Sequence, residues 1–516
     1  MFCTIYVLYF LRSTVSLYDI FYRYYCLYSI GQNTFLQDSL KGKFLNRKFP
    51  VKKIALFSPE NVIIGLMGTE KNDRYLINDK PIKAIWIFAL PLIIGNFFQQ
   101  TYTMVDSMVV GRYVSSDALA AIGASYAFTN IFIWIAGGGG IGASVIASRY
   151  FGNKKYKLMK TSIYSAMIDF LVFSVIMALV GLLVGRPVMM LLRTPESVLD
   201  EAVIYLNIYF CGLPFLFMYN IISAMFNAIG KSKIPLYFLI FSSVFNIGLD
   251  IFMVRILHMG IAGVAWATLV AQGLSAIISF FALLRIMKTF YEDDPEEKVS
   301  LFSAQESLRM AGIALPSILQ QATVAIGMML VQSVVNGFGP LALAGFSAAA
   351  RVENFVAVPW SAFNNAMSTY TAQNLGAGQK QRVRQGYIAT NKLIMLFGLG
   401  FFVILELFAG NIIRLFLGEN ITETALSVGC GYITFLGLCS YLLGLKMSVD
   451  GMLRGAADTK AFTIANLVNL ALRVLISFTL APIYGVAFVW IASPIGWAAN
   501  WLISYAHYRK TDLAKG

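Results

Sequence analysis

The hydrophobic residues of the chain fall into twelve long runs, each at least as long as the about 20 residues that a helix needs to cross a bilayer. Short breaks rich in Gly, Pro or charged residues separate them, as at 152–155 and 230–233. We therefore predict an all-α membrane protein with twelve transmembrane helices. Their approximate ranges are 83–108, 118–147, 161–185, 203–229, 235–257, 261–287, 311–336, 341–372, 388–412, 426–453, 461–481 and 484–507.

A charged segment near the middle of the chain separates two sets of six runs. Residues 291–298 form the longest polar connection of the hydrophobic part, and we predict an inter-lobe linker at 291–308. Two six-helix lobes at 81–290 and 309–510 and a short tail at 511–516 follow from this division.

The two halves also resemble each other in sequence. An offset of 224 residues pairs Ala118–Ala120 with Ala342–Ala344 and Gly152 with Gly376. Because six is an even number, both copies cross the membrane in the same direction. We therefore predict two six-helix bundles related by a pseudo-two-fold axis along the membrane normal, an arrangement that places a cavity between them and permits alternating access.

Residues 1–80 precede the first run and read as an N-terminal extension. Our preferred hypothesis is that the mature protein begins near Met67, because the polar lead 70–83 then enters the first helix directly. On this hypothesis most of the extension is absent from the mature protein.

The composition agrees with a membrane location. Hydrophobic residues make up 58% of the chain and charged residues 13%, a balance that cannot coat a water-soluble surface. The net charge is +14, and loops after even-numbered runs hold about three times as many Lys and Arg as the other loops, which predicts that they face the cytoplasm. We expect a multi-pass protein of the plasma membrane, with both termini cytoplasmic and no nucleic-acid partner.

Several kinds of chemistry are disfavoured by the residues present. Five cysteines without paired spacing argue against a disulfide scaffold, and two histidines argue against a His-rich metal site. No ATPase domain accompanies the runs, so any transport would depend on an ion gradient or on a partner. The small residues 137–142 favour tight helix packing over a ligand site.

Acidic residues inside a bilayer are costly and usually functional or paired. Asp106 and Asp250 lie about 10 Å from the outer ends of their helices at 1.5 Å per residue, and Thr268 lies at a similar depth. Asn246 precedes Asp250 by four residues and so shares its helix face. Oxygen ligands suit hard cations, and paired carboxylates can share a proton. We predict a cation-coupling site for Na⁺ or H⁺ at these four residues; the alternative is that each caps or pairs separately.

The second half lacks this set of residues. Asn246 aligns with Asn469, but Asp250 aligns with Arg473 and Thr268 with Trp490. For the remaining intramembrane charges we favour mutual ion pairing, for example of Glu353 with Lys446 or Arg473. A contact between Glu353 and a cationic substrate is the alternative, and we expect Gln99, Glu353, Asn469 and Arg473 to line a substrate cavity.

Together these features resemble the multidrug and toxic compound extrusion (MATE) transporters, in particular the prokaryotic type. The resemblance covers about residues 70–510 and rests on the two six-span lobes, Pro91 and Asp106 in the first span, Asn246-x-x-x-Asp250, and Thr268 eighteen residues later. The segment 454–460 is similar to the family's loop after span 10.

The resemblance implies a cation-coupled antiporter that exports amphipathic, often cationic drugs. It implies that Asp106, Asn246, Asp250 and Thr268 bind Na⁺ or H⁺ and that Pro91 bends the first span as a hinge. We expect a secondary exporter that works by alternating access as a monomer in the bilayer, without a cofactor or enzymatic activity. A flippase for a lipid-linked precursor and a membrane-embedded enzyme are the alternatives.

Overall fold

A computed structural model describes residues 74–192, 194–290, 299–418 and 421–515. All of them belong to one compact unit, Thr69–Gly516. The hypothesis that the mature protein begins near Met67 concerns residues outside the described ranges.

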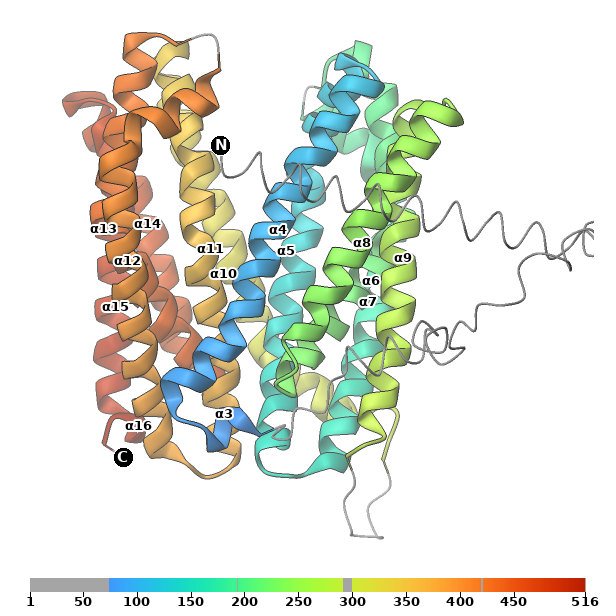
Figure 1. Ribbon diagram of the computed structural model, residues 1–516, viewed down its shortest axis with the longest axis vertical. Helices are drawn as coiled ribbons and strands as arrows, with labels where there is room; N and C mark the ends of the chain where they lie inside the picture. The colour runs from blue at the N-terminus through green and yellow to red at the C-terminus, as the bar shows by residue number, and fades with distance from the viewer. Residues whose placement is uncertain (1–73, 193, 291–298, 419–420, 516) are drawn as a thin grey trace, which may run out of the picture. The chain divides into compact units, whose positions relative to one another are not determined.

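The first half of the described chain forms six long helices after one short one (Figure 1). In chain order they are α3 (Tyr75–Asn78), α4 (Pro81–Tyr113), α5 (Ser116–Gly152), α6 (Tyr156–Leu191), α7 (Glu196–Ala228), α8 (Lys233–Ile251), continued by the π-helical turn η3 (Phe252–Ile256), and α9 (Gly260–Met287).

The second half repeats the pattern. Its helices are α10 (Ala304–Asn336), α11 (Pro340–Gly376), α12 (Lys380–Leu417), α13 (Glu423–Gly455), α14 (Thr459–Tyr484), α15 (Ala487–Lys510) and the short α16 (Asp512–Lys515). Twelve helices in the described ranges are long and apolar enough to cross a membrane, and no strand occurs there. The predicted all-α fold with twelve spans is confirmed.

Helix ends differ from the predicted ranges where a cap decides them. α10 begins at Ala304, inside the stretch expected to be the linker. The Ser303 hydroxyl accepts a hydrogen bond from the Glu306 backbone N–H, and Glu306 stands in the first turn, where a negative charge is favourable. The seventh span therefore starts earlier than its hydrophobicity alone indicates.

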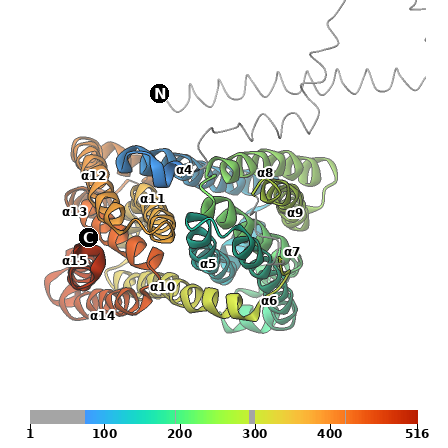
Figure 2. The same cartoon turned by 90° about the horizontal axis from the view of Figure 1, so that it is seen from below.

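The helices of each half pack mainly with one another, as the view along the bundles shows (Figure 2). In the N-terminal lobe α7 packs against α5, α6 and α9, and in the C-terminal lobe α13 packs against α11, α12 and α15. The two lobes are thus built around equivalent central helices, the fourth of each set of six.

The first helix of each lobe also packs against the other lobe. Ile85 and Phe88 of α4 belong to the same buried cluster as Trp360 of α11, whereas Val110, near the other end of α4, packs in the N-terminal lobe. Pro91 is buried in α4 within the part that packs against the C-terminal lobe, because Ile93 beyond it belongs to the same cluster. α10 behaves in the same way, because it packs against α5 and α6 as well as α14.

Glycines allow the closest approaches between the lobes. A Cβ on Gly142 would collide with the backbone of Ala314 in α10, and one on Gly138 would press on Ile318. The predicted tight helix packing is confirmed at Gly138 and Gly142, whereas nothing lies within 4 Å of the Cβ position of Gly137. The repeat-related Gly152 and Gly376 lie against the backbones of Gln373 and Arg149, respectively, so α5 and α11 meet symmetrically.

Polar contacts reinforce this region, which we call the contact end and define by Gly152, Ala228, Gly376 and Ala456. The Gln373 amide donates to the Ala228 carbonyl at 2.7 Å, and the Arg149 guanidinium donates to the Ala456 carbonyl at 2.9 Å. Each bond joins one lobe to the other.

Helix α3, part of the predicted extension, lies across the contact end. Arg74, just before it, donates to the Gly152 carbonyl of the N-terminal lobe at 2.6 Å. From the other lobe, Arg382 donates to the carbonyl of Asp79 at 2.6 Å and to that of Leu76 at 3.3 Å. α3 therefore bridges the two lobes.

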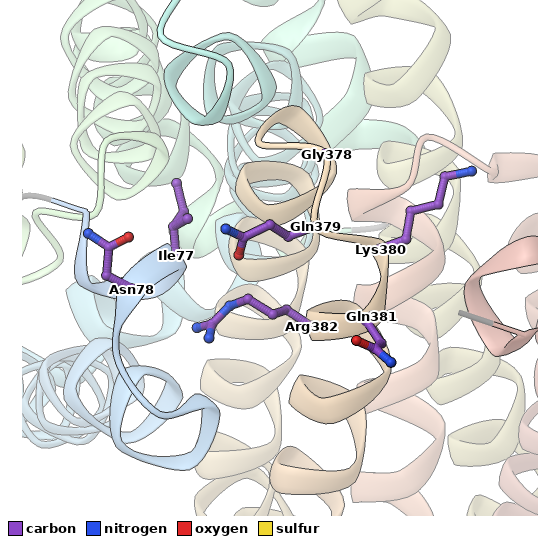
Figure 3. A pocket seen from close by; sticks show the side chains of 7 residues that line it. All are labelled: Ile77, Asn78, Gly378, Gln379, Lys380, Gln381 and Arg382. Atoms are coloured by element: carbon purple, nitrogen blue, oxygen red, sulfur yellow. The ribbon is translucent and has the colours of Figure 1, made fainter.

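A pocket of about 670 Å³ lies between α3 and the start of α12. Figure 3 shows its lining residues, which are Ile77, Asn78, Gly378, Gln379, Lys380, Gln381 and Arg382. Because the guanidinium of Arg382 already binds the carbonyls of Leu76 in α3 and of Asp79 just after it, its charge stabilises the junction between the lobes.

The glycine contacts at the contact end give a first prediction. Gly152→Ala and Gly376→Ala should each destabilise the protein by about 1–3 kcal/mol, because the new Cβ must displace a backbone carbonyl. Gly410→Ala is the matched control, since nothing lies within 4 Å of its Cβ position in α12 and alanine is the better helix former. Thermal unfolding of the purified protein in one detergent measures all three. Equal melting temperatures would contradict the packing role.

Candidate functional site

The four predicted coupling residues lie together in the N-terminal lobe. Asp106 comes from α4, Asn246 and Asp250 from one face of α8, and Thr268 from α9. Asp250 is fully buried and Asn246 is 2% exposed. Directly after Asp250, α8 passes into the π-helical turn η3, and such turns are frequent at functional sites.

The carboxyl groups of Asp106 and Asp250 lie within hydrogen-bonding distance of each other. One oxygen of each, Oδ1, is buried without a hydrogen-bond partner. Among the described residues neither carboxyl forms an ion pair with a Lys or Arg. Two adjacent carboxylates repel each other, so this pair requires a shared proton or a bound cation.

Asn246 connects the pair to its neighbours. The Tyr102 hydroxyl contacts the side-chain amide of Asn246, and the same amide lies 3.4 Å from Thr268 Oγ1. With the amide turned so that its nitrogen faces Asp250, Asn246 donates to Asp250 Oδ2 at 3.1 Å and its oxygen accepts from the Thr268 backbone N–H at 3.1 Å. The turned orientation supplies a hydrogen bond to the buried carboxylate, which favours it physically.

Two tyrosines complete the surroundings and were absent from the predicted set. Tyr102 lies one helical turn before Asp106 on α4, a spacing of four that could have indicated it. Tyr205 of α7 is close enough to act electrostatically on both carboxyls. It also lines a narrow cavity with Thr268 and Gln272. No sequence spacing relates α7 to α4, so only the packed fold reveals Tyr205.

The site offers carboxyl, amide and hydroxyl oxygens, which are the ligands that hard monovalent cations prefer. The described residues contain no group of three or more His, Cys, Asp or Glu that could hold a metal ion. Two carboxyls and neutral oxygens suit one Na⁺ ion, or one proton shared by the carboxyls.

The residues predicted to line a substrate cavity are divided between two places. Glu353, Asn469 and Arg473 line one pocket of about 160 Å³ in the C-terminal lobe, together with Lys446. Gln99 is exposed on α4 and does not line this pocket.

The predicted ion pairing of Glu353 with Lys446 or Arg473 is wrong. Lys446 pairs instead with Asp450 at 2.9 Å, and both side chains are almost fully buried. Their spacing of four on α13 places them on one helix face, a signal that sequence reasoning missed. Glu353 accepts a 2.5 Å hydrogen bond from the Tyr432 hydroxyl.

Comparison with known proteins agrees with this architecture. A family model named MatE matches residues 91–252 and 316–479, one match in each half and together more than half of the chain. The relative named "Probable multidrug resistance protein YpnP" from Bacillus subtilis (strain 168) is 28% identical over 388 residues, which cover 75% of this chain and 85% of that protein. A FAD transporter from Shewanella oneidensis is 24% identical, over 67% of this chain and 76% of that protein.

Solved structures are similar as well. A multidrug resistance MATE family transporter in an outward-facing conformation aligns with a TM-score of 0.78 and 21% identity, over 86% of this chain and 98% of that one. At this identity the likeness supports the fold, two lobes of six helices each.

The Lys446–Asp450 pair gives a second prediction. Asp450→Ala should destabilise the protein by about 3–5 kcal/mol, because it leaves Lys446 charged and buried without a counter-ion. Adding Lys446→Ala should restore part of that loss. Thermal unfolding of both variants in detergent tests this. A double variant that is less stable than Asp450→Ala would show that the two side chains stabilise the lobe independently.

Proposed function

Because the chain belongs to the MatE family of membrane transporters, we propose that it exports amphipathic, often cationic small molecules in exchange for Na⁺ or H⁺. The observation that carries the proposal is the pair of intramembrane carboxyls, Asp106 and Asp250, which touch each other and have no basic partner among the described residues. Such a pair is stable in a bilayer when a cation or a proton neutralises it, so its occupancy follows the ion gradient.

Coupling requires that the cation and the exported molecule prefer different conformations. Asp106 stands on the part of α4 that belongs to the N-terminal lobe, whereas Ile85 and Phe88 pack into the C-terminal lobe. In the proposed mechanism a cation draws Asp106 and Asp250 together and so fixes that part of α4. Pro91, which cannot donate a helical hydrogen bond, is the hinge at which the other part reorients.

The proposed orientation places the contact end in the cytoplasm. The turns there carry Lys154, Lys155 and Lys231, in line with the cytoplasmic enrichment of basic residues. In this proposed orientation both termini lie on the cytoplasmic side of the plasma membrane. The hydrogen bonds that join the lobes at this end fit a state whose cavity is closed toward the cytoplasm and releases its substrate outward.

The protein is a transporter and not an enzyme, but the relatives leave the transported compound open. They include proteins named for multidrug resistance and a protein named for FAD transport. Export of drugs by a functional monomer is our first choice, and movement of a lipid-linked precursor is the second. The second choice is favoured by Arg473, a basic residue that lines the C-terminal pocket.

The coupling site gives a third prediction. Asp106→Asn and Asp250→Asn should each abolish ion-driven ethidium efflux from proteoliposomes. Each variant leaves a single carboxyl, which removes the repulsion between adjacent carboxylates that makes the site take up a cation or a proton. Glu406→Gln is the matched control, because Glu406 is an exposed acid within the α12 span. It should leave the efflux rate unchanged.

The same vesicles separate the two coupling ions. An inward Na⁺ gradient at equal pH and a pH gradient without Na⁺ are imposed in turn, and the gradient that drives efflux identifies the ion. Full efflux by both aspartate variants would refute the site assignment. If neither the Na⁺ gradient nor the pH gradient drives efflux by the unchanged protein, the proposed export function is refuted.

A further inference from the structure

Two residues that line the C-terminal pocket align with coupling residues in the internal sequence repeat. An offset of 223 residues pairs Asn246 with Asn469 and Asp250 with Arg473. Asn469 and Arg473 line the pocket, as Asn246 and Asp250 belong to the coupling site. The sequence alignment of the halves thus places a base in the second copy where the first has an acid.

The tyrosines on the fourth helix of each lobe support this equivalence. Helices α7 and α13 are both 33 residues long and begin at Glu196 and Glu423, an offset of 227 that places Tyr205 at Tyr432. Tyr205 lies near the two carboxyls of the first lobe. Tyr432 donates a hydrogen bond to Glu353 and lies near Arg473. Near the aligned tyrosine the second lobe therefore has one acid and one base, where the first lobe has two acids.

Trp490 replaces Thr268 in the second copy. Its ring stacks on that of Tyr432, with centroids 5.5 Å apart and an interplanar angle of 12°. In the sequence alignment an oxygen ligand is thereby exchanged for an aromatic ring that packs on Tyr432.

Of the four charged residues that lie in or beside the pocket, two neutralise each other. Asp450 pairs with Lys446 and also accepts hydrogen bonds from three neutral donors. These donors are Gln320 at 3.3 Å, Asn466 at 3.4 Å and Ser504 at 3.5 Å. The Lys446–Asp450 pair is therefore satisfied within the protein.

The other two charged residues, Glu353 and Arg473, have no ion partner within the described ranges. Glu353 is 7% exposed, and Tyr432 donates to one of its oxygens. The Nε of Arg473 and the Oδ1 of Asn469 are buried without a hydrogen-bond partner. Unpaired charges at membrane depth are expensive, which makes these groups candidates for ligand contacts.

We propose that this pocket binds the charged end of a zwitterionic compound, with Glu353 contacting its cationic amine and Arg473 its carboxylate or phosphate. The inference rests on the proposed export function and names a substrate class for it. A purely cationic ligand would leave Arg473 unpaired, and a purely anionic one would leave Glu353 unpaired. The volume of about 160 Å³ holds a charged group and its nearest atoms, so the rest of the compound extends out of the pocket.

Two dyes that differ at one group test the proposal. Rhodamine 110 carries a free carboxylate beside its cationic ring system, and rhodamine 123 is its methyl ester, which has only the positive charge. Fluorescence anisotropy of each dye, titrated with purified full-length protein in lipid nanodiscs without an ion gradient, gives the two affinities.

Arg473→Gln should weaken rhodamine 110 binding about tenfold, which corresponds to about 1.4 kcal/mol, and leave rhodamine 123 unchanged. Arg473→Lys should keep most of the rhodamine 110 affinity, because the positive charge remains. Arg351→Gln is the control for a lost arginine, since Arg351 is exposed on the same helix as Glu353 and does not line the pocket. Glu353→Gln should weaken both dyes, as both carry the cation.

Equal loss of both dyes in Arg473→Gln, or no loss of either, would overturn the proposal. If Arg473→Gln does not fold, failure of Arg473→Lys to bind rhodamine 110 more tightly than rhodamine 123 would overturn it as well. Because the binding titration uses no ion gradient, the difference between the two dyes can be observed even if ion-driven ethidium efflux fails. The two proposals are therefore tested independently.

A zwitterionic lipid headgroup has the same chemistry as a zwitterionic compound. Nanodiscs of phosphatidylethanolamine and of phosphatidylglycerol distinguish the two sources. Equal rhodamine 110 affinity in both lipids supports a compound from solution as the occupant. Weaker binding in phosphatidylethanolamine would overturn that choice in favour of the headgroup.

Discussion

The constraint on which the proposed mechanism depends is the meeting of two carboxyls at membrane depth. Asp250 is fully buried, Asp106 touches it, and neither has a basic partner among the described residues. In a low-dielectric interior such a pair is unstable unless a positive charge or a proton joins it. Asn246 can donate one hydrogen bond to the pair, but an amide carries no net charge. The negative charge of the pair is therefore left for a mobile cation or a proton to neutralise.

This local requirement reaches the whole molecule through α4. One part of that helix packs with Trp360 in the C-terminal lobe and the other with Phe132 in the N-terminal lobe. A change in how Asp106 is bound therefore changes the packing of α4 around Pro91 and at the junction between the lobes. A site buried inside one lobe can in this way bias two conformations of the pair, which is the minimum that coupled transport needs.

The sequence predicted what periodicity and membrane energetics control. Hydrophobic runs gave twelve helices, and the spacing of four between Asn246 and Asp250 gave a shared face. Contacts between helices distant in sequence were beyond reach, and Tyr205 joins the coupling site only because α7 packs beside α9. The role of α3 was missed for the same reason, since its partners Gly152 and Arg382 are far from it in sequence. Pairing Glu353 with Lys446 failed because a closer acid, Asp450, lies on the same helix.

The repeat shows which features the fold requires and which it leaves free. Gly152 and Gly376 are equivalent, and each lies against the backbone of the opposite lobe, where a Cβ would prevent the crossing of α5 and α11. Asp250 and Arg473 are also aligned in the sequence repeat, yet they carry opposite charges. Backbone packing between the lobes must be self-complementary about the pseudo-two-fold axis. The glycines that permit this close contact therefore occur as a symmetric pair, one in each lobe. A pocket inside one lobe faces no such requirement, and its chemistry can diverge while the architecture stays the same.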